Sequence, residues 1–363
     1  MSLLSLNVFV FQNNSYSWDA AGKGNNPGGA YRDTWDANST HAKMTEFSFY
    51  MFNKIANKLT LYPLITGRKG DIIAFSNAPD VDDTGNESGV PTMRGHFHNP
   101  ETGTNYLGEK APTAISEFKD RIHDAFNEYG FEYLTGIALE NERWYDTRFS
   151  GDHERYYSAR YNLGKALHFL QDLSMPFHAK NIIARYNPGD VVFDGIGHVG
   201  YENEVRRKFQ DRSLTDNYSK KLPSISGNFD EDLRKITSEL NEFGYNKFGE
   251  VINHNTREQA SKELFAKTIM ASADVLYVLS IYLEKVKLQT HKELLVPHLT
   301  CKEGGYRISH ETFRVGLINL YNLVCGEVKI HPFTEEELRR LNAREGGEDF
   351  SIFIPIITNL ILN

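Results

Sequence analysis

Two histidine–carboxylate pairs lie close together in the middle of the sequence. His168 and Asp172 are four residues apart in ALHFLQDLSMPFHAK, and His198 and Glu202 have the same spacing in HVGYENEV. Residues four apart on a helix share one face, so the two members of each pair can contact a common ion. His178 lies between the pairs, just after a proline that must end the first helix. Imidazole nitrogens and carboxylate oxygens are zinc ligands, so this pattern predicts a zinc site.

Either pair alone has a simpler interpretation, a surface pair that stabilises its helix by about 0.2–0.5 kcal/mol. Two such pairs within the 35 residues from His168 to Glu202, on both sides of a Pro-His turn, favour metal binding instead. The apolar residues Leu163, Leu167 and Leu170 fall on the opposite arc of the first helix. We therefore expect the His168–Asp172 pair to lie off the packing face of that helix.

The remaining pattern predicts an all-α protein. We expect helices at about residues 40–59, 112–128, 131–147, 154–173, 199–211, 229–247 and 256–287. The stretches 67–112 and 179–198 are rich in residues typical of turns and read as long loops, which in compact domains usually carry function. Few segments alternate in the manner of strands. After about residue 290 the pattern changes, which indicates a C-terminal extension.

The composition limits the classes of function. The chain has 363 residues, 40% of them hydrophobic, and a formal net charge of -8. A net negative charge argues against a nucleic-acid partner but suits an enzyme in which bound cations supply positive charge locally. No apolar run is expected to span a bilayer. The two cysteines, Cys301 and Cys325, exclude a Cys-rich zinc site and form either one disulfide or two free thiols.

The first residues have two interpretations. The apolar run LLSLNVFVF is followed by Ser15-Tyr16-Ser17, with small residues at the positions that a signal peptidase prefers. Residues 1–17 are therefore either a signal-peptide remnant or an ordinary first element of the fold. Cleavage after Ser17 would make Trp18 the N-terminal residue of a secreted protein.

The motif HFLQDLSMPFHA, followed by His-x-x-x-Glu, resembles the bacterial zinc-dependent phospholipases C, the family that includes the clostridial alpha-toxins. The segment GHFHNPETGTNY resembles their ligand loop and places His96 at a ligand position. THAKM resembles their first helix and gives His41, and APDVDD resembles their loop aspartate and gives Asp80. The resemblance covers about residues 18–287. It implies a catalytic domain at 18–288 and leaves the extension at 289–363 without an assigned role.

The resemblance also implies two or three zinc ions. The first would be bound by Asp80, His96, His168 and Asp172. The second would be bound by His178, His198 and Glu202, and the third by His41, the bridging Asp172 and the amino group and carbonyl of Trp18. Trp35-Asp36 is a second candidate for the N-terminal pair, and Asp71, Asp82 and Asp83 are substitutes for Asp80. The third ion depends on where the mature chain begins.

The activity that the resemblance implies is phospholipase C hydrolysis at a membrane surface, giving diacylglycerol and a phosphorylated headgroup. Asp80 is also a candidate for orienting or deprotonating the attacking water. The headgroup is not predicted, because the residues around Trp18, Asp80 and His96 do not match the choline-preferring relatives. One alternative is a single-strand-specific nuclease of the related three-zinc fold, whose last ligand is Asp where this chain has Glu202. Another is a secreted protein that binds zinc without catalysis.

Overall fold

The computed structural model describes residues 39–56, 62–81, 93–135, 138, 140–144, 153–183, 195–209 and 222–284. The chain divides into two compact units, residues 1–125 with 140–284 and residues 126–139 with 285–363. The predictions for residues 1–17, Trp18, Trp35, Asp82, Asp83, Cys301, Cys325 and 289–363 lie outside the described residues.

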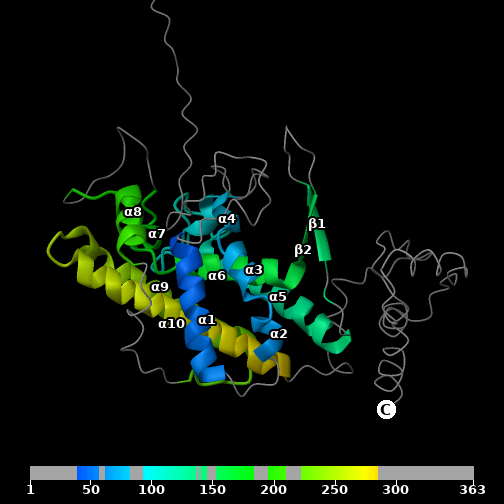
Figure 1. The fold of residues 1–363 in the computed structure, drawn as a ribbon. Helices are drawn as coiled ribbons and strands as arrows, with labels where there is room; N and C mark the ends of the chain where they lie inside the picture. Colours follow the sequence, from blue (N-terminus) through cyan, green and yellow to red (C-terminus); the bar gives the residue numbers. More distant parts are fainter. Residues whose placement is uncertain are drawn as a thin grey trace, which may run out of the picture. The chain divides into compact units, whose positions relative to one another are not determined.

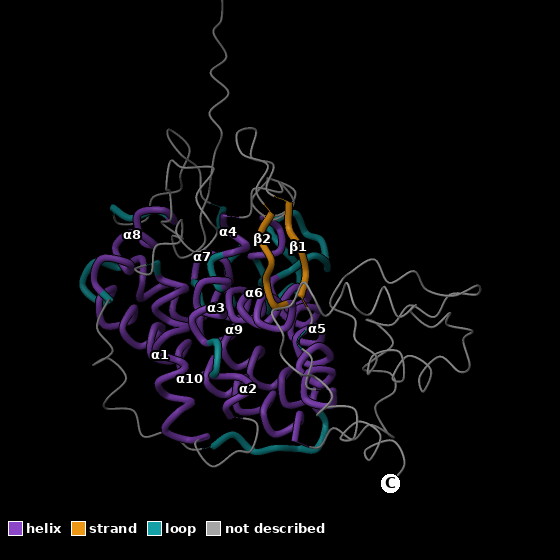
Figure 2. The backbone as a smooth tube through the Cα atoms, turned by 45° about the vertical axis from the view of Figure 1, so that its right-hand side comes forward, coloured by secondary structure: helices purple, strands orange, loops and turns teal. Residues whose placement is uncertain are grey.

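The described part is helical, as the sequence predicts, and Figure 2 shows helices (purple) making up most of it. The elements are, in order, α1 (Thr40–Ala56), α2 (Tyr62–Thr66), α3 (Lys69–Phe75), α4 (Ala78–Val81), η1 (Met93–His96), α5 (Ala114–Thr135), β1 (Glu140–Trp144), β2 (His153–Tyr157), α6 (Ser158–Asp172), α7 (Pro176–Ala179), α8 (His198–Lys208), α9 (Phe229–Ile252) and α10 (Arg257–Glu284). The first helix begins where the Ser39-Thr40 cap predicts, because the Ser39 hydroxyl accepts the backbone N–H of Ala42.

Helix α6 lies at the centre of the first unit. Helices α1, α3, α4 and α10 all pack against it (Figure 1). Every residue of α6 except Tyr161 is buried. The expectation that His168 and Asp172 lie off the packing face is therefore wrong, because neighbouring helices cover α6 on all sides.

Helices α9 and α10 lie side by side and α1 packs on α10, which completes the helical core. By length and composition α10 is apolar enough to cross a membrane, unlike the sequence expectation. In this structure 72% of its most apolar window is buried inside the protein. That burial is what a core helix shows, since its apolar side chains already pack against α1, α6 and α9.

Residues 131–147 do not form the predicted helix. Helix α5 continues to Thr135, and β1 then pairs antiparallel with β2, with Glu140 opposite Tyr157 and Trp144 opposite His153. The strands ENERW and HERYY are mostly polar and lack the alternation of apolar and polar residues by which a strand is recognised. They are stabilised by backbone hydrogen bonds to each other. The helix predicted from residue 154 accordingly begins at Ser158.

The predicted loop at 67–112 contains helices α3, α4 and η1, so Asp80 lies on a helical turn rather than in a loop. Helices this short are not stable alone and depend on tertiary packing. Ile72 and Phe75 supply that packing, since both are buried and α3 packs against α6.

The contact between α3 and α6 depends on Gly164. A Cβ atom on this residue would lie 2.5 Å from the Cβ of Phe75 and 2.8 Å from the carbonyl oxygen of Ile72. Replacing Gly164 with Ala should lower the free energy of unfolding by about 1–3 kcal/mol, because the helices must separate. This steric cost should exceed the gain of about 1 kcal/mol that Ala brings to a helix. Urea unfolding followed by circular dichroism measures the difference.

Gly249 provides the matched control. It lies in α9, and a Cβ atom there would meet nothing within 4 Å. Gly249→Ala should therefore leave stability unchanged or raise it by up to about 1 kcal/mol. Equal changes in the free energy of unfolding in both variants would show that the close contact at Gly164 does not determine how α3 and α6 pack.

Candidate metal centre

The structure brings together eight of the side chains that the sequence predicts as metal ligands. They are His41 from α1, Asp80 from α4, His96 from η1, His168 and Asp172 from α6, His178 from α7, and His198 and Glu202 from α8. All eight are buried, with no more than 5% of any residue exposed. Asp71 does not join them, because it lies on α3 with a carboxylate oxygen 3.8 Å from Arg68 Nη1.

The first group of donor atoms surrounds one point between η1, α4 and α6. His96 Nδ1 lies 2.8 Å from Asp172 Oδ2 and 3.1 Å from His168 Nε2. His168 Nε2 lies 3.2 Å from Asp172 Oδ2 and 3.6 Å from Asp80 Oδ1. Tetrahedral ligands about 2.0–2.1 Å from a zinc ion are about 3.3 Å from one another. The donors of His96, His168 and Asp172 are 2.8–3.2 Å apart, which suits a shared zinc ion. Asp80 Oδ1 lies further out, 3.6 Å from His168 Nε2 and 3.8 Å from His96 Nδ1.

The second group joins α7 and α8. His198 Nε2 lies 2.9 Å from Glu202 Oε1, and His178 Nε2 lies 3.8 Å from the same oxygen. Because α8 begins at His198, Glu202 follows one turn later on the same face. These three residues can hold one ion with three protein ligands.

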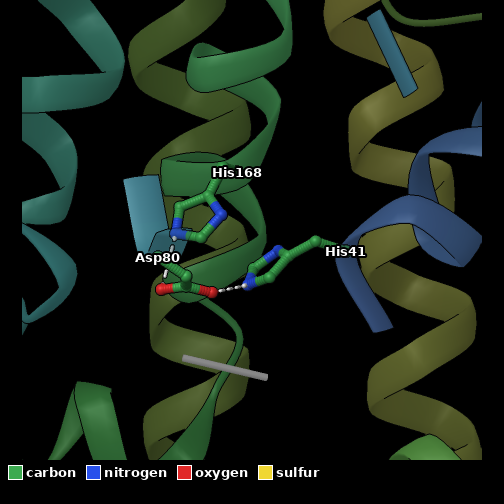
Figure 3. A group of neighbouring side chains, drawn as sticks. All are labelled: His41, Asp80 and His168. Carbon is green, nitrogen blue, oxygen red and sulfur yellow. Dashed lines mark ion pairs between the residues drawn. The ribbon is translucent and has the colours of Figure 1, made fainter. Parts of the chain in front are cut away.

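The third group lies between α1 and the two aspartates. His41 Nε2 is 3.7 Å from Asp172 Oδ1 and 3.8 Å from Asp80 Oδ2. Figure 3 shows the Asp80 carboxylate with one oxygen toward His168 and the other toward His41. Asp172 divides its oxygens in the same way, with Oδ2 toward His96 and Oδ1 toward His41. Each aspartate can therefore bridge two ions.

Backbone carbonyls orient two of the histidines. His168 Nδ1 lies 2.8 Å from the carbonyl oxygen of Ser76, and His198 Nδ1 lies 2.7 Å from that of Ile182. A carbonyl oxygen only accepts, so each Nδ1–H donates and each Nε2 presents its lone pair to the cluster. Such outer contacts are usual around metal-binding histidines.

The Ser39 hydroxyl ties two of these elements together. It caps α1 one residue before Thr40 and lies 2.5 Å from Asn77 Oδ1. Asn77 belongs to the turn between α3 and α4, the turn that also supplies the Ser76 carbonyl and precedes Asp80. The sequence indicates the Ser39 cap, but nothing in it indicates the hydrogen bond from Ser39 to Asn77.

Burial and neighbouring groups shift the pKa values of three residues of the cluster. Desolvation lowers the pKa of His178 to about 4. Burial, together with the neighbouring His168, lowers the pKa of His41 well below its usual value. Burial acts in the opposite direction on Asp172, but the adjacent His168 and His96 hold the pKa of this carboxyl well below its usual range. Neutral imidazoles beside an ionised carboxylate are the state in which these groups bind metal.

The fold and site define an all-α protein with a buried cluster of histidines and carboxylates that could bind metal. No family model matches the chain. It is 25% identical over 206 residues to a phospholipase C from Paraclostridium bifermentans, over 55% of this chain and 42% of that protein. It is 32% identical over 115 residues to a phospholipase C from Listeria monocytogenes, over 31% of this chain and 29% of that protein. The chain thus spans less than half the length of these relatives.

The fold agrees with this relationship. The chain is similar to the crystal structure of the alpha-toxin of an avian strain of Clostridium perfringens, with a TM-score of 0.50 and 18% identity, over 68% of this chain and 64% of that one. The similarity to the alpha-toxin-like phospholipases C is therefore confirmed, in sequence by the curated relatives and in helical fold by the solved structure.

Proposed function

We propose that the chain is a zinc-dependent phospholipase C, a hydrolase that cleaves the glycerol-side phosphodiester of phospholipids to diacylglycerol and a phosphorylated headgroup. The observation that carries this proposal is the cluster of eight buried histidines and carboxylates, grouped around three positions in which neighbouring donor atoms lie 2.8–3.8 Å apart. Its relatives named phospholipase C support the reaction type.

The donor set fits zinc, because it combines imidazole nitrogens with carboxylate oxygens. Asp80, His96, His168 and Asp172 would hold the first ion, and His178, His198 and Glu202 the second. His41 and Asp172 would contribute to a third, with Trp18 as the ligand proposed from the sequence. Zinc bound there would neutralise phosphate oxygens and lower the pKa of water to about 7.

Side chains of the protein would leave a position for water or phosphate, orient the water and transfer its proton. Three protein ligands at His178, His198 and Glu202 leave a tetrahedral site one position for water or a phosphate oxygen. Asp80 has a second possible role besides ligation, because its carboxylate could orient the attacking water or accept its proton. The proton would then pass to the leaving glycerol oxygen. The burial of the cluster keeps these charges in a low dielectric, where they act strongly on the substrate.

Specific observations argue against the two alternatives, a nuclease and a non-catalytic zinc-binding protein. A related nuclease would have Asp where this chain has Glu202, and the net charge of -8 does not favour a nucleic-acid substrate. A zinc site without catalysis is usually closed by four protein ligands, whereas the group around Glu202 has three among the described residues. A phospholipid substrate at a membrane surface, encountered after secretion, is consistent with the proposed reaction.

The test uses the purified full chain with zinc, vesicles of phosphatidylcholine or phosphatidylethanolamine, and single-stranded DNA. We expect release of diacylglycerol and phosphorylated headgroup, and a loss of about a thousandfold or more in the variant His168→Ala, which removes a ligand of the first group. His123→Ala is the control. His123 is an outer histidine paired with Asp230 at 2.8 Å, and its loss should leave hydrolysis unchanged.

Four results would contradict the proposal. Cleavage of DNA without phospholipid hydrolysis would favour the nuclease. Stoichiometric zinc without either reaction would favour the non-catalytic protein. Less than a trace of bound zinc, or full activity in His168→Ala, would remove the basis for a zinc enzyme.

A further inference from the structure

Gln171 occupies a position next to the cluster that no ligand assignment includes. It lies on α6 directly before Asp172 and is fully buried. Its side-chain oxygen Oε1 lies 2.7 Å from His41 Nδ1. Its amide nitrogen Nε2 donates to Thr45 Oγ1 at 2.9 Å. The Gln171 side chain therefore connects the central helix to two successive turns of one face of α1.

The direction of this amide decides which nitrogen of His41 carries the proton. An amide oxygen only accepts, so His41 Nδ1–H must donate to Gln171 Oε1. The other nitrogen, Nε2, then carries a lone pair in place of a hydrogen and points between the carboxylates of Asp80 and Asp172, at 3.8 Å and 3.7 Å. The opposite direction of the amide would place a hydrogen on His41 Nε2, and that hydrogen would exclude a metal ion from this position.

Thr45 and the packing of His41 keep the arrangement in place. Thr45 is fully buried, and its hydroxyl oxygen accepts a hydrogen bond from the amide nitrogen of Gln171. The ring of His41 stacks on the ring of His168, with centroids 3.8 Å apart and an interplanar angle of 27°. The ring plane is thus set by His168, and the remaining choice between the two tautomers is made by Gln171.

We propose that Gln171 is a positioning residue that holds His41 Nε2 toward the third metal position, between Asp80 and Asp172. The inference rests on the proposed zinc-dependent function. Outer partners of metal-binding histidines typically change metal affinity ten- to a hundredfold. The hydrogen bond of Gln171 reaches only His41, whereas His168 of the first group and His198 of the second are oriented by the carbonyls of Ser76 and Ile182.

The test compares two substitutions in the full chain. Gln171→Leu removes both polar atoms at similar size, and Gln171→Glu keeps an acceptor for His41 Nδ1–H. Zinc affinity is measured by competition with a chromophoric chelator, and the tautomer of His41 by long-range ¹H–¹⁵N correlation of labelled histidines. We expect one zinc equivalent to bind ten- to a hundredfold more weakly in Gln171→Leu and to recover to within a few-fold in Gln171→Glu. The other equivalents should be unchanged in both variants.

Thr45→Val supplies a second variant that leaves Gln171 and His41 in place. It removes the hydroxyl that fixes the amide, so the same zinc equivalent should weaken, but by less than in Gln171→Leu. Circular dichroism and thermal unfolding show whether each variant is folded.

Two results would overturn the inference while leaving the proposed function intact. One is wild-type affinity for every zinc ion in both Gln171→Leu and Thr45→Val. The other is a proton on Nε2 of His41 in the zinc-free wild-type protein. A wild-type protein without bound zinc would instead overturn the proposed function itself, and the tautomer spectrum would still report whether Gln171 fixes His41.

Discussion

Replacing Asp172 with Asn should reduce phospholipid hydrolysis by about three orders of magnitude or more and should release zinc from more than one position. Asp172 Oδ2 lies 2.8 Å from His96 Nδ1 and 3.2 Å from His168 Nε2. Its other oxygen, Oδ1, lies 3.4 Å from His178 Nδ1 and 3.7 Å from His41 Nε2. One carboxylate thus faces the first and third groups and also contacts Nδ1 of His178, whose Nε2 faces the second group. Asparagine keeps its size but loses its charge, and one end becomes an N–H donor that cannot bind a cation.

The measurements are zinc content by mass spectrometry and the rate of headgroup release, each per mole of folded protein. Asp230→Asn is the matched control, since it makes the same change on α9 at a side chain that is 56% exposed and paired with His123. It should bind and hydrolyse as the wild type does. An Asp172→Asn protein that kept its full zinc content and lost less than tenfold in rate would show that Asp172 is not a shared ligand.

The fold could be predicted from the sequence where the pattern is local. The Ser39-Thr40 cap fixes the start of α1, and α9 and α10 are long enough for their helical patterns to be recognised. The hairpin of β1 and β2 was not predictable in this way, because neither strand alternates apolar and polar residues and each is stabilised by the other strand. Helix α3 depends on burial of Ile72 and Phe75 against α6, which a Gly- and Asp-rich local pattern does not reveal.

In the site, too, local spacings could be predicted from the sequence, whereas contacts between distant segments could not. The two four-residue spacings predict that His168 and Asp172, and His198 and Glu202, share helix faces, and these pairs do lie 3.2 Å and 2.9 Å apart. The face argument for α6 was wrong, since amphipathicity describes one helix and not what surrounds it. Gln171 carried no signal at all. Its partner His41 is 130 positions away, and only the packing of α1 on α6 brings them together.

Removing zinc should abolish hydrolysis and also lower the melting temperature of the protein. The cluster joins elements from α1 to α8, and without cations the negative charges of Asp80, Asp172 and Glu202 remain buried. An ion present at a thousandfold its dissociation constant stabilises the folded state by about 4 kcal/mol. For a chain of 363 residues, an unfolding entropy of about 2.1 cal/mol/K per residue makes each kcal/mol correspond to about 1.3 °C. Differential scanning calorimetry after treatment with 1,10-phenanthroline should therefore show a decrease of about 5 °C for each tightly bound ion lost.

Two controls separate metal loss from other effects of the chelator. The isomer 1,7-phenanthroline cannot chelate, and it should change neither activity nor melting temperature. Zinc should restore both properties, whereas Mg²⁺ should not, because Mg²⁺ prefers six oxygen ligands and this cluster offers five imidazoles and three carboxylates. If chelation abolished activity and left the melting temperature unchanged, the helical core around α6 and α10 would support the site without its ions, and the cluster would contribute to catalysis alone.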